Sequence, residues 1–207
     1  GEANPIEDGG YPALGGAGSI TVTASGGLVY NNITNNGHGG GIHIVNEFYG
    51  TSITSSCHVE VKDVAEIYNN KCYGNGGGVY VNGGDFVMNG GTIGKSSYPN
   101  IAHHGNGGGI AVDGGNITIN NGNINYNQAK FENNTGGFGG AFALTGGIAT
   151  ITGGIISYNN ADRNGGGFWV DVASASFITT IKGGATVANN TAVNGAGAYV
   201  NQGQLVI

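Results

Sequence analysis

Clustered carboxylates are the first sign of acid/base chemistry, because such catalysis needs two carboxylates, or a carboxylate beside His or Lys, held near each other. Glu60, Asp63 and Glu66 form an acidic cluster in this chain, and Lys62 lies beside them. All three carboxylates fall within one short segment, where the simpler interpretation is a solvated edge. No serine or cysteine lies in a nucleophile motif. We therefore predict that the chain is not an enzyme.

Residues that bind metals are also sparse. His103 and His104 are adjacent and could bind a metal weakly, but a surface loop is the simpler interpretation. Cys57 and Cys72 lack the further Cys or His partners of a zinc site. In a secreted chain these two cysteines could form a disulfide, and the alternative is two buried thiols. We predict no metal and no other cofactor.

Composition and charge indicate which classes of protein this chain can belong to. The chain has 207 residues, of which 45 are glycine and only 9% are charged, and its net charge is −6. The six basic residues are scattered, so the basic face that nucleic-acid binding requires is missing. No apolar run approaches the roughly 20 residues of a membrane helix. Many short runs of Val, Ile, Phe and Tyr argue against disorder, and one domain is expected at this length.

A glycine motif followed by a short apolar segment recurs along the chain. Its copies read GGGIHI, GGGVYV, GGGIAV, GGAFAL, GGGFWV and GAGAYV, and they begin at Gly39, Gly76, Gly107, Gly139, Gly165 and Gly195. The spacings between them are 37, 31, 32, 26 and 30 residues. A second alternating segment accompanies the copies, as in HVEVK, NITIN and IATIT. A third ends in an apolar residue, two variable residues and Asn, and its copy at Ser97 is the weakest.

The repeat predicts the fold. A unit of about 30 residues with three strands of period 2 cannot bury its apolar side alone, whereas stacked units can. We therefore predict an all-β fold, a single-stranded parallel β-helix of about six to seven coils with three short strands per coil. A right-handed solenoid is expected from the rule for parallel crossovers. An antiparallel sandwich is the alternative, but it would not require the same side chain at the same place in every repeat.

Stacking assigns a place to each repeated side chain. Inside the coil we expect the outer members of the first-strand triplets and the apolar residues of the second strands. The first set is Ile42 and Ile44, Val79 and Val81, Ile110 and Val112, Phe142 and Leu144, Phe168 and Val170, and Ala198 and Val200. The second set is Ile20 and Val22, Val59 and Val61, Phe86 and Met88, and Ile117 and Ile119. The repeated asparagines should form a hydrogen-bonded ladder that helps to satisfy the turn backbone: Asn32, Asn70, Asn100, Asn127, Asn159 and Asn190.

Two rows of side chains are expected to face solvent. On the first strand the row is His43, Tyr80, Ala111, Ala143, Trp169 and Tyr199. Aromatic rings can stack on sugar faces, so Tyr80, Trp169 and Tyr199 form a candidate ligand platform. A plain outer face is the alternative, because Tyr and Trp suit strand surfaces generally. On the second strand the row is Thr21, Glu60, Val87, Thr118, Thr150, Thr180 and Val206. A row of threonines resembles the flat face of ice-binding solenoids, but Glu60, Val87 and Val206 interrupt it, which argues against ice binding.

The glycine motif paired with the apolar-x-x-Asn motif resembles the repeats of polymorphic outer-membrane proteins, which are adhesins of the autotransporter type. Their repeats are GGA followed by Ile, Leu or Val, and FxxN. GGAF at Gly139 and FENN at Phe131 are the nearest matches. The resemblance spans roughly residues 19 to 207. It implies a secreted passenger or stalk segment that adheres or spaces.

From the repeat and this resemblance we expect an extracellular, non-enzymatic β-helix, which is an adhesin-like or structural cell-surface protein. Residues 19–207 would form the β-helix, continuing or stacking beyond the C-terminus, and residues 1–18 an N-terminal extension or cap. Its partner would be a cell-surface receptor or glycan, with no nucleic acid and no membrane insertion by this chain.

Two alternatives to the adhesin-like function remain. One is a filament subunit that stacks end to end through its coils, because unpaired strand edges need covering. The other is a carbohydrate-binding or carbohydrate-active module that uses Tyr80, Trp169 and Tyr199.

Overall fold

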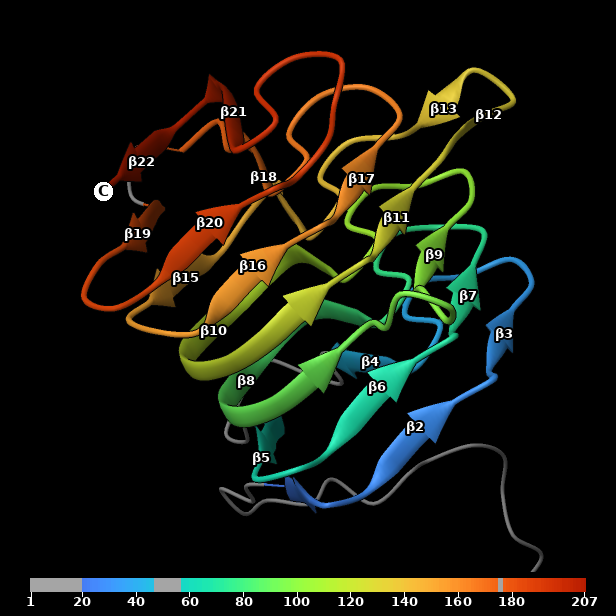
Figure 1. The fold of residues 1–207 in the computed structure, drawn as a ribbon, viewed down its shortest axis with the longest axis vertical. Helices are drawn as coiled ribbons and strands as arrows, with labels where there is room; N and C mark the ends of the chain where they lie inside the picture. Colours follow the sequence, from blue (N-terminus) through green and yellow to red (C-terminus); the bar gives the residue numbers. More distant parts are fainter. Residues whose placement is uncertain (1–19, 47–56, 175–176) are drawn as a thin grey trace, which may run out of the picture.

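Short alternating segments and glycine bends wind the chain into a parallel β-solenoid (Figure 1). The structure is a computed structural model that describes residues 20–46, 57–174 and 177–207. Within these residues every regular element is a strand. The predicted all-β parallel β-helix is therefore confirmed.

Each coil contains the three predicted strands, which we call the first, second and third strand. Copies of the first strand are β4 (Ile42–Val45), the start of β8 (Val79–Ile93), the start of β10 (Ile110–Asn125), β14 (Phe142–Leu144), β18 (Phe168–Asp171) and β21 (Ala198–Gln202). Copies of the second are β1 (Ile20–Ser25), β5 (Cys57–Lys62), the middle of β8 and β10, β15 (Ile148–Ile151), β19 (Ile178–Ile181) and β22 (Gln204–Val206). Copies of the third are β2 (Leu28–Tyr30), β6 (Glu66–Tyr68), the ends of β8 and β10, β16 (Ile155–Ser157) and β20 (Thr186–Ala188).

Equivalent strands of successive coils pair in parallel, and the turns run right-handed as expected (Figure 1). Five complete turns separate the first and the last copy of the first strand. This number is smaller than the six to seven coils that counting the repeats predicts, because the turns at both ends of the described chain are incomplete.

Two features go beyond the three predicted strands. A fourth strand of two residues follows the third in most coils: β3 (Ile33–Thr34), β7 (Lys71–Cys72), β9 (Ile101–Ala102), β11 (Gln128–Ala129) and β17 (Asn160–Ala161). An antiparallel hairpin, β12 (Phe131–Glu132) with β13 (Thr135–Gly136), then projects beside β11 and β17 (Figure 1). The FENN segment, which resembles the FxxN motif of the adhesin repeats, lies in this hairpin and is not part of the ladder.

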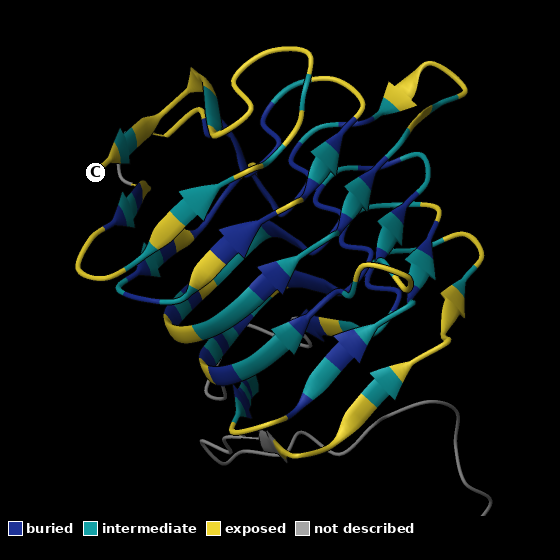
Figure 2. Cartoon of the chain, viewed as in Figure 1, coloured by how far each residue is buried: buried dark blue, intermediate teal, exposed yellow. Residues whose placement is uncertain are grey.

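The interior of the solenoid is filled by the predicted side chains. In the central coils the inward residues of the first and second strands are fully buried (Figure 2). Phe142 and Phe168 stack across neighbouring coils, with ring centres 4.8 Å apart and planes 2° apart. The end coils are the exceptions, because Ile42 and Ala198 are half-buried and Val200 is 42% exposed.

The pairing of β1 with β5 differs from the alignment of second strands that the sequence predicts. Val22 and Ala24 pair with Val59 and Val61, so β1 sits two residues further along than the sequence pattern suggested. Thr23 rather than Thr21 accordingly pairs with Glu60. The prediction that the side chains of Ile20 and Val22 are buried falls on side chains outside the described residues.

The predicted asparagine ladder is present and continuous. From Asn32 to Asn159, each side-chain Nδ2 donates to Oδ1 of the next ladder asparagine, at distances between 2.9 and 3.0 Å. From Asn70 to Asn190, each Nδ2 also donates to a backbone carbonyl of the preceding coil. Four ladder asparagines, Asn70, Asn100, Asn127 and Asn159, are buried. The amides therefore satisfy one another and the turn backbone, as buried polar groups require.

The weak copy of the asparagine signature has a structural explanation. Ile93, not Ser97, occupies the apolar place before Asn100: Ile93 pairs with Ile67 and Ile124, and its carbonyl accepts from Asn127. Residues 94–99, four more than lie between Ile67 and Asn70, form a loop in which Lys95 and Tyr98 make an antiparallel bridge. An insertion after the third strand therefore leaves the ladder in register.

Candidate functional site

The outward row of the first strands, which we call the first face, is not a surface. Tyr80 is only 4% exposed and Trp169 only 8%, and Ala111 and Ala143 are buried between them. Tyr199 is half-buried in the last coil. The prediction that these middle residues face solvent is therefore wrong for the central coils. Tyr80, Trp169 and Tyr199 do not form an open ligand platform.

The chain itself covers the first face. The segment before the glycine motif packs on the first strands at two places: the His38 ring stacks on Tyr80 at 4.4 Å, and the Phe138 ring stacks on Trp169 at 4.7 Å. The guanidinium of the exposed Arg163 lies 4.5 Å from the centre of the Phe138 ring. A second, smaller hydrophobic cluster outside the coil consists of Tyr80, Ala111, Ala143 and Trp169, with Phe138 and Tyr199 packed against it.

Glycine is what lets this segment approach so closely. Gly107 has φ +69°, and a Cβ at that position would lie 2.3 Å from the Ile110 carbonyl oxygen and 2.8 Å from the Ala111 Cβ. Any side chain there would push the covering segment away from the first face. The glycine motif thus allows both the bend of the chain and the close approach of the preceding segment to the first face.

Burial changes the chemistry of one tyrosine on the covered face. The Tyr80 hydroxyl donates a hydrogen bond of 2.6 Å to Asp113. Burial, and then the hydrogen bond and the negative charge of Asp113, raise the pKa of Tyr80 well above its ordinary value. The pair holds a proton firmly, which suits a structural role.

The predicted acidic cluster is split between separate partners. Glu60 accepts from the Asn89 amide at 2.8 Å, and Glu66 pairs with Lys95 at 2.6 Å. Asp63 accepts a hydrogen bond from Ser25. Each carboxylate thus has its own hydrogen-bond partner, and a cation lies within 4 Å of Glu66 (Lys95) and of Glu60 (Lys62), whereas Asp63 has only the uncharged Ser25 hydroxyl among the described residues.

The two adjacent histidines gather around one carboxylate. His103 Nδ1 lies 3.2 Å from Glu132 Oε1, and His104 Nε2 lies 3.9 Å from Glu132 Oε2. Tyr73 packs against both imidazoles, with ring centres 5.6 and 5.0 Å away. Among the described residues, no group of three or more His, Cys, Asp or Glu side chains is placed to hold a metal ion. The cluster ties the hairpin to the preceding coil.

The two cysteines are free, so the disulfide considered from the sequence is not formed. Cys57 Sγ donates to the Val45 carbonyl, whereas Cys72 Sγ donates to the Gly74 carbonyl. Cys72 is fully buried, and burial raises the pKa of its thiol to about 12. The alternative of two buried thiols therefore holds for Cys72, whereas Cys57 is only half-buried.

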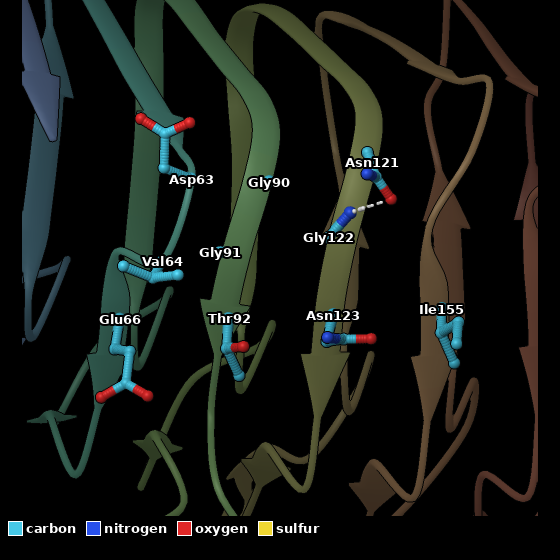
Figure 3. A pocket seen from close by; sticks show the side chains of 10 residues that line it. All are labelled: Asp63, Val64, Glu66, Gly90, Gly91, Thr92, Asn121, Gly122, Asn123 and Ile155. Atoms are coloured by element: carbon cyan, nitrogen blue, oxygen red, sulfur yellow. Dashed lines mark hydrogen bonds between the residues drawn. The ribbon is translucent and has the colours of Figure 1, made fainter. Parts of the chain in front are cut away.

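The outward side of the third strands is open. On this third face, the residues that directly precede the inward residues form a row in paired register: Leu28, Glu66, Thr92, Asn123, Ile155 and Thr186. A groove of about 410 Å³ lies where the chain bends from the second strand into the third. Figure 3 shows its lining from four successive coils, with Asp63 and Asn121 along one side and Glu66, Thr92 and Asn123 along the other. Its floor is formed by Gly90, Gly91 and Gly122.

Sequence reasoning missed the groove residues. Thr92 and Asn123 directly precede Ile93 and Ile124, which point inward. Because side chains alternate along a strand, Thr92 and Asn123 are therefore expected to point outward. That signal was available in the sequence. The depth of the groove was not, because it depends on how the glycine bends of neighbouring coils align.

Tyrosines mark the corner between the third face and the ladder. Tyr30 stacks on Tyr68 at 5.3 Å, and Tyr126 stacks on Tyr158 at 5.1 Å, with planes 13° and 8° apart. Rings that stack between coils cover one another's faces and present mainly their edges to solvent. This corner therefore offers little free ring surface for stacking on a sugar.

The second strands and the last coil offer two further surfaces. The outward threonines Thr118, Thr150 and Thr180 are half-buried and lie in one paired row. Beside the last coil, an apolar pocket of about 350 Å³ opens onto interior side chains that include Phe168, Ile181 and Val187.

Comparisons with known proteins find nothing similar to this chain. No family model matches it, and no significant match is found among curated proteins or among solved structures. Within the described residues no helix is long and apolar enough to cross a membrane.

Proposed function

We propose that this chain is a non-enzymatic, adhesin-like β-helix of a cell surface that binds an extended ligand along its third face. One observation carries the proposal: the groove is lined by four successive coils, so it can follow a ligand along the solenoid axis. The resemblance of the repeats to those of surface adhesins supports the location, and the stacked coils supply a stiff support.

A groove-filling substitution tests the proposal. Asn123→Arg places a long side chain in the groove, whereas Thr150→Arg adds the same charge to the second strands, outside it. We expect the fluorescently labelled wild-type chain and Thr150→Arg to bind isolated cell-surface polymers equally, and Asn123→Arg to lose binding. Equal binding by all three proteins would show that the groove is not the binding surface.

A second candidate is end-to-end assembly into a filament. The apolar pocket beside the last coil favours it, because the half-buried Val187 and Ala198 line it and leave interior side chains partly uncovered there. We expect light scattering by the wild-type chain to rise with concentration, with filaments visible by electron microscopy, and Ala198→Asp to prevent both. A wild-type chain that stays monomeric at every concentration would remove this candidate.

A further inference from the structure

Several polar side chains that line the groove have no hydrogen-bond partner among the described residues, whereas some outward asparagines outside it are paired. Outward asparagines elsewhere bond across coils: Asn120 donates to Asn89 at 2.8 Å, and Asn116 donates to Asp85 at 2.8 Å. In the groove, by contrast, the Thr92 hydroxyl and the Asn123 amide have no hydrogen-bond partner among the described residues. Asn121 uses only its Oδ1, which accepts from the Gly122 N–H at 2.8 Å (Figure 3).

These groups are spaced by the solenoid itself. Glu66 pairs with Thr92, Thr92 with Asn123, and Asn123 with Ile155, so each coil contributes one side chain to the row. Neighbouring strands lie about 4.8 Å apart. Figure 3 shows the four side chains side by side on adjacent strands. A ligand that repeats its polar groups at nearly this step would meet a new partner on every coil.

We infer that the ligand of this groove is a linear, uncharged glycan that lies along the solenoid axis across Glu66, Thr92 and Asn123. The inference rests on the proposed function and specifies the ligand of the same site. An extended pyranose chain advances by nearly one coil step per sugar. Its neighbouring hydroxyls can both donate to and accept from a carboxamide such as that of Asn123.

The edges of the groove fit a sugar chain as well. Val64 is 76% exposed and Ile155 47% exposed, and both line the groove, where they can cover the C–H surface of a sugar ring. An extended peptide is a poorer fit, because peptides bind sheets by adding to an edge, whereas this row lies on a sheet face.

The charges of the groove select against an anionic ligand. Two carboxylates line it, and only Glu66 has a paired cation, Lys95 at 2.6 Å. Asp63 is exposed and accepts from the uncharged Ser25 hydroxyl. A polyanion would therefore be repelled, whereas hydroxyl groups can donate to the free lone pairs of both carboxylates.

Calorimetric titration of the full chain tests the inference. The probes are a β-1,4-linked glucose hexasaccharide, a β-1,4-linked N-acetylglucosamine hexasaccharide, a galacturonic acid hexasaccharide and an extended Ser/Asn-rich decapeptide. The double variant Thr92→Ala/Asn123→Ala removes the free groups. Its matched control is Thr118→Ala/Thr150→Ala, which removes two half-buried outward threonines from the second strands.

We expect at least one neutral hexasaccharide to bind, with affinity about tenfold weaker in the groove variant and unchanged in the control. Binding of only the galacturonate or the peptide, weakened by the groove variant, would overturn the glycan inference and leave the proposed binding face intact. Binding that both double variants retain would overturn the inference and the proposed face together. Circular dichroism and urea midpoints equal to those of wild type establish that the variants are folded.

Discussion

The alternation of side chains along a strand points residues outward on both the first and the third face, but the two faces differ in how far those residues are buried. On the first face the outward Trp169 is 8% exposed, whereas on the third face the outward Ile155 is 47% exposed. The difference arises from the path of the chain around each strand. Segments that precede two of the glycine motifs pack on the first strands through His38 and Phe138, whereas the third strands end at a corner that turns the chain away. The corner is held by left-handed residues such as Asn69 and Tyr126, with φ of 54° and 61°.

This contrast separates two uses of outward residues in a solenoid. A covered face adds a second layer of packing outside the coil, so its aromatic residues serve stability. An open face leaves polar groups unpaired, so its residues are available for a ligand. Substitutions in the covered or buried part should therefore cost far more stability than matched substitutions in the exposed part.

The largest effect is expected from Trp169→Ala. The side chain is 8% exposed and stacks on Phe138, so its removal leaves a cavity in the outer cluster. We expect the free energy of unfolding to fall by about 4 kcal/mol. Tyr158→Ala removes a ring that is 51% exposed and should cost about 1 kcal/mol or less. Urea unfolding measures both, and equal costs would show that the first face is not covered in solution.

The next effect compares two asparagines that lie four residues apart. Asn127→Ala removes a buried ladder amide that bonds to Asn100, Asn159 and the Ile93 carbonyl. We expect a loss of about 3 kcal/mol, because the buried partners remain unpaired. Asn123→Ala in the groove should change the free energy of unfolding by about 0.5 kcal/mol or less. A ladder variant as stable as the groove variant would contradict a structural role for the ladder.

A smaller effect tests how the cover is made. Gly107→Ala places a Cβ 2.3 Å from the Ile110 carbonyl oxygen at φ +69°, and should cost about 2 kcal/mol. Gly184→Ala is the control, because a Cβ there has no neighbour within 4 Å. The control should stay within about 0.5 kcal/mol of wild type. Trp169 fluorescence gives a second measurement. Its emission should shift to longer wavelength only if Gly107→Ala also exposes Trp169, which lies two coils further along.

The smallest effect depends on pH. Tyr80→Phe removes the hydrogen bond to Asp113 and should cost about 1 kcal/mol at neutral pH. Because the fold raises the pKa of Tyr80 above its ordinary value of 10.0, the folded state holds this proton more tightly than the unfolded state. That stabilisation is complete below pH 10 and is lost above it, by about 1.4 kcal/mol per pH unit.

The stability gap between Tyr80→Phe and wild type should therefore close as the pH rises from 8 to about 11. Urea midpoints over this range measure the gap. A constant gap would mean that the phenol of Tyr80 is not buried in solution.

Much of this architecture follows from local pattern. Period-2 segments such as Ile117–Ile119 and Phe168–Val170 place their outer members in the coil, and the repeated asparagines stack because each coil places them at the same corner. Even the groove residues Thr92 and Asn123 follow the alternation of the third strand. Insertions are harder to read from pattern, as the displacement of Ser97 by Ile93 shows, because residues that loop out leave the register of the strands unchanged.

The sequence by itself determined the parallel solenoid, its interior and the asparagine ladder, because a repeated local pattern can bury its apolar side only by stacking on itself. Only the tertiary structure decided which outward row is surface. Tyr80 and Trp169 are buried, whereas Thr92 and Asn123 are only half-buried along a groove, because the path of the segment before the next glycine motif determines which strand it covers. That path depends on contacts between coils, such as His38 on Tyr80 and Phe138 on Trp169, and the alternation within a strand carries no information about them.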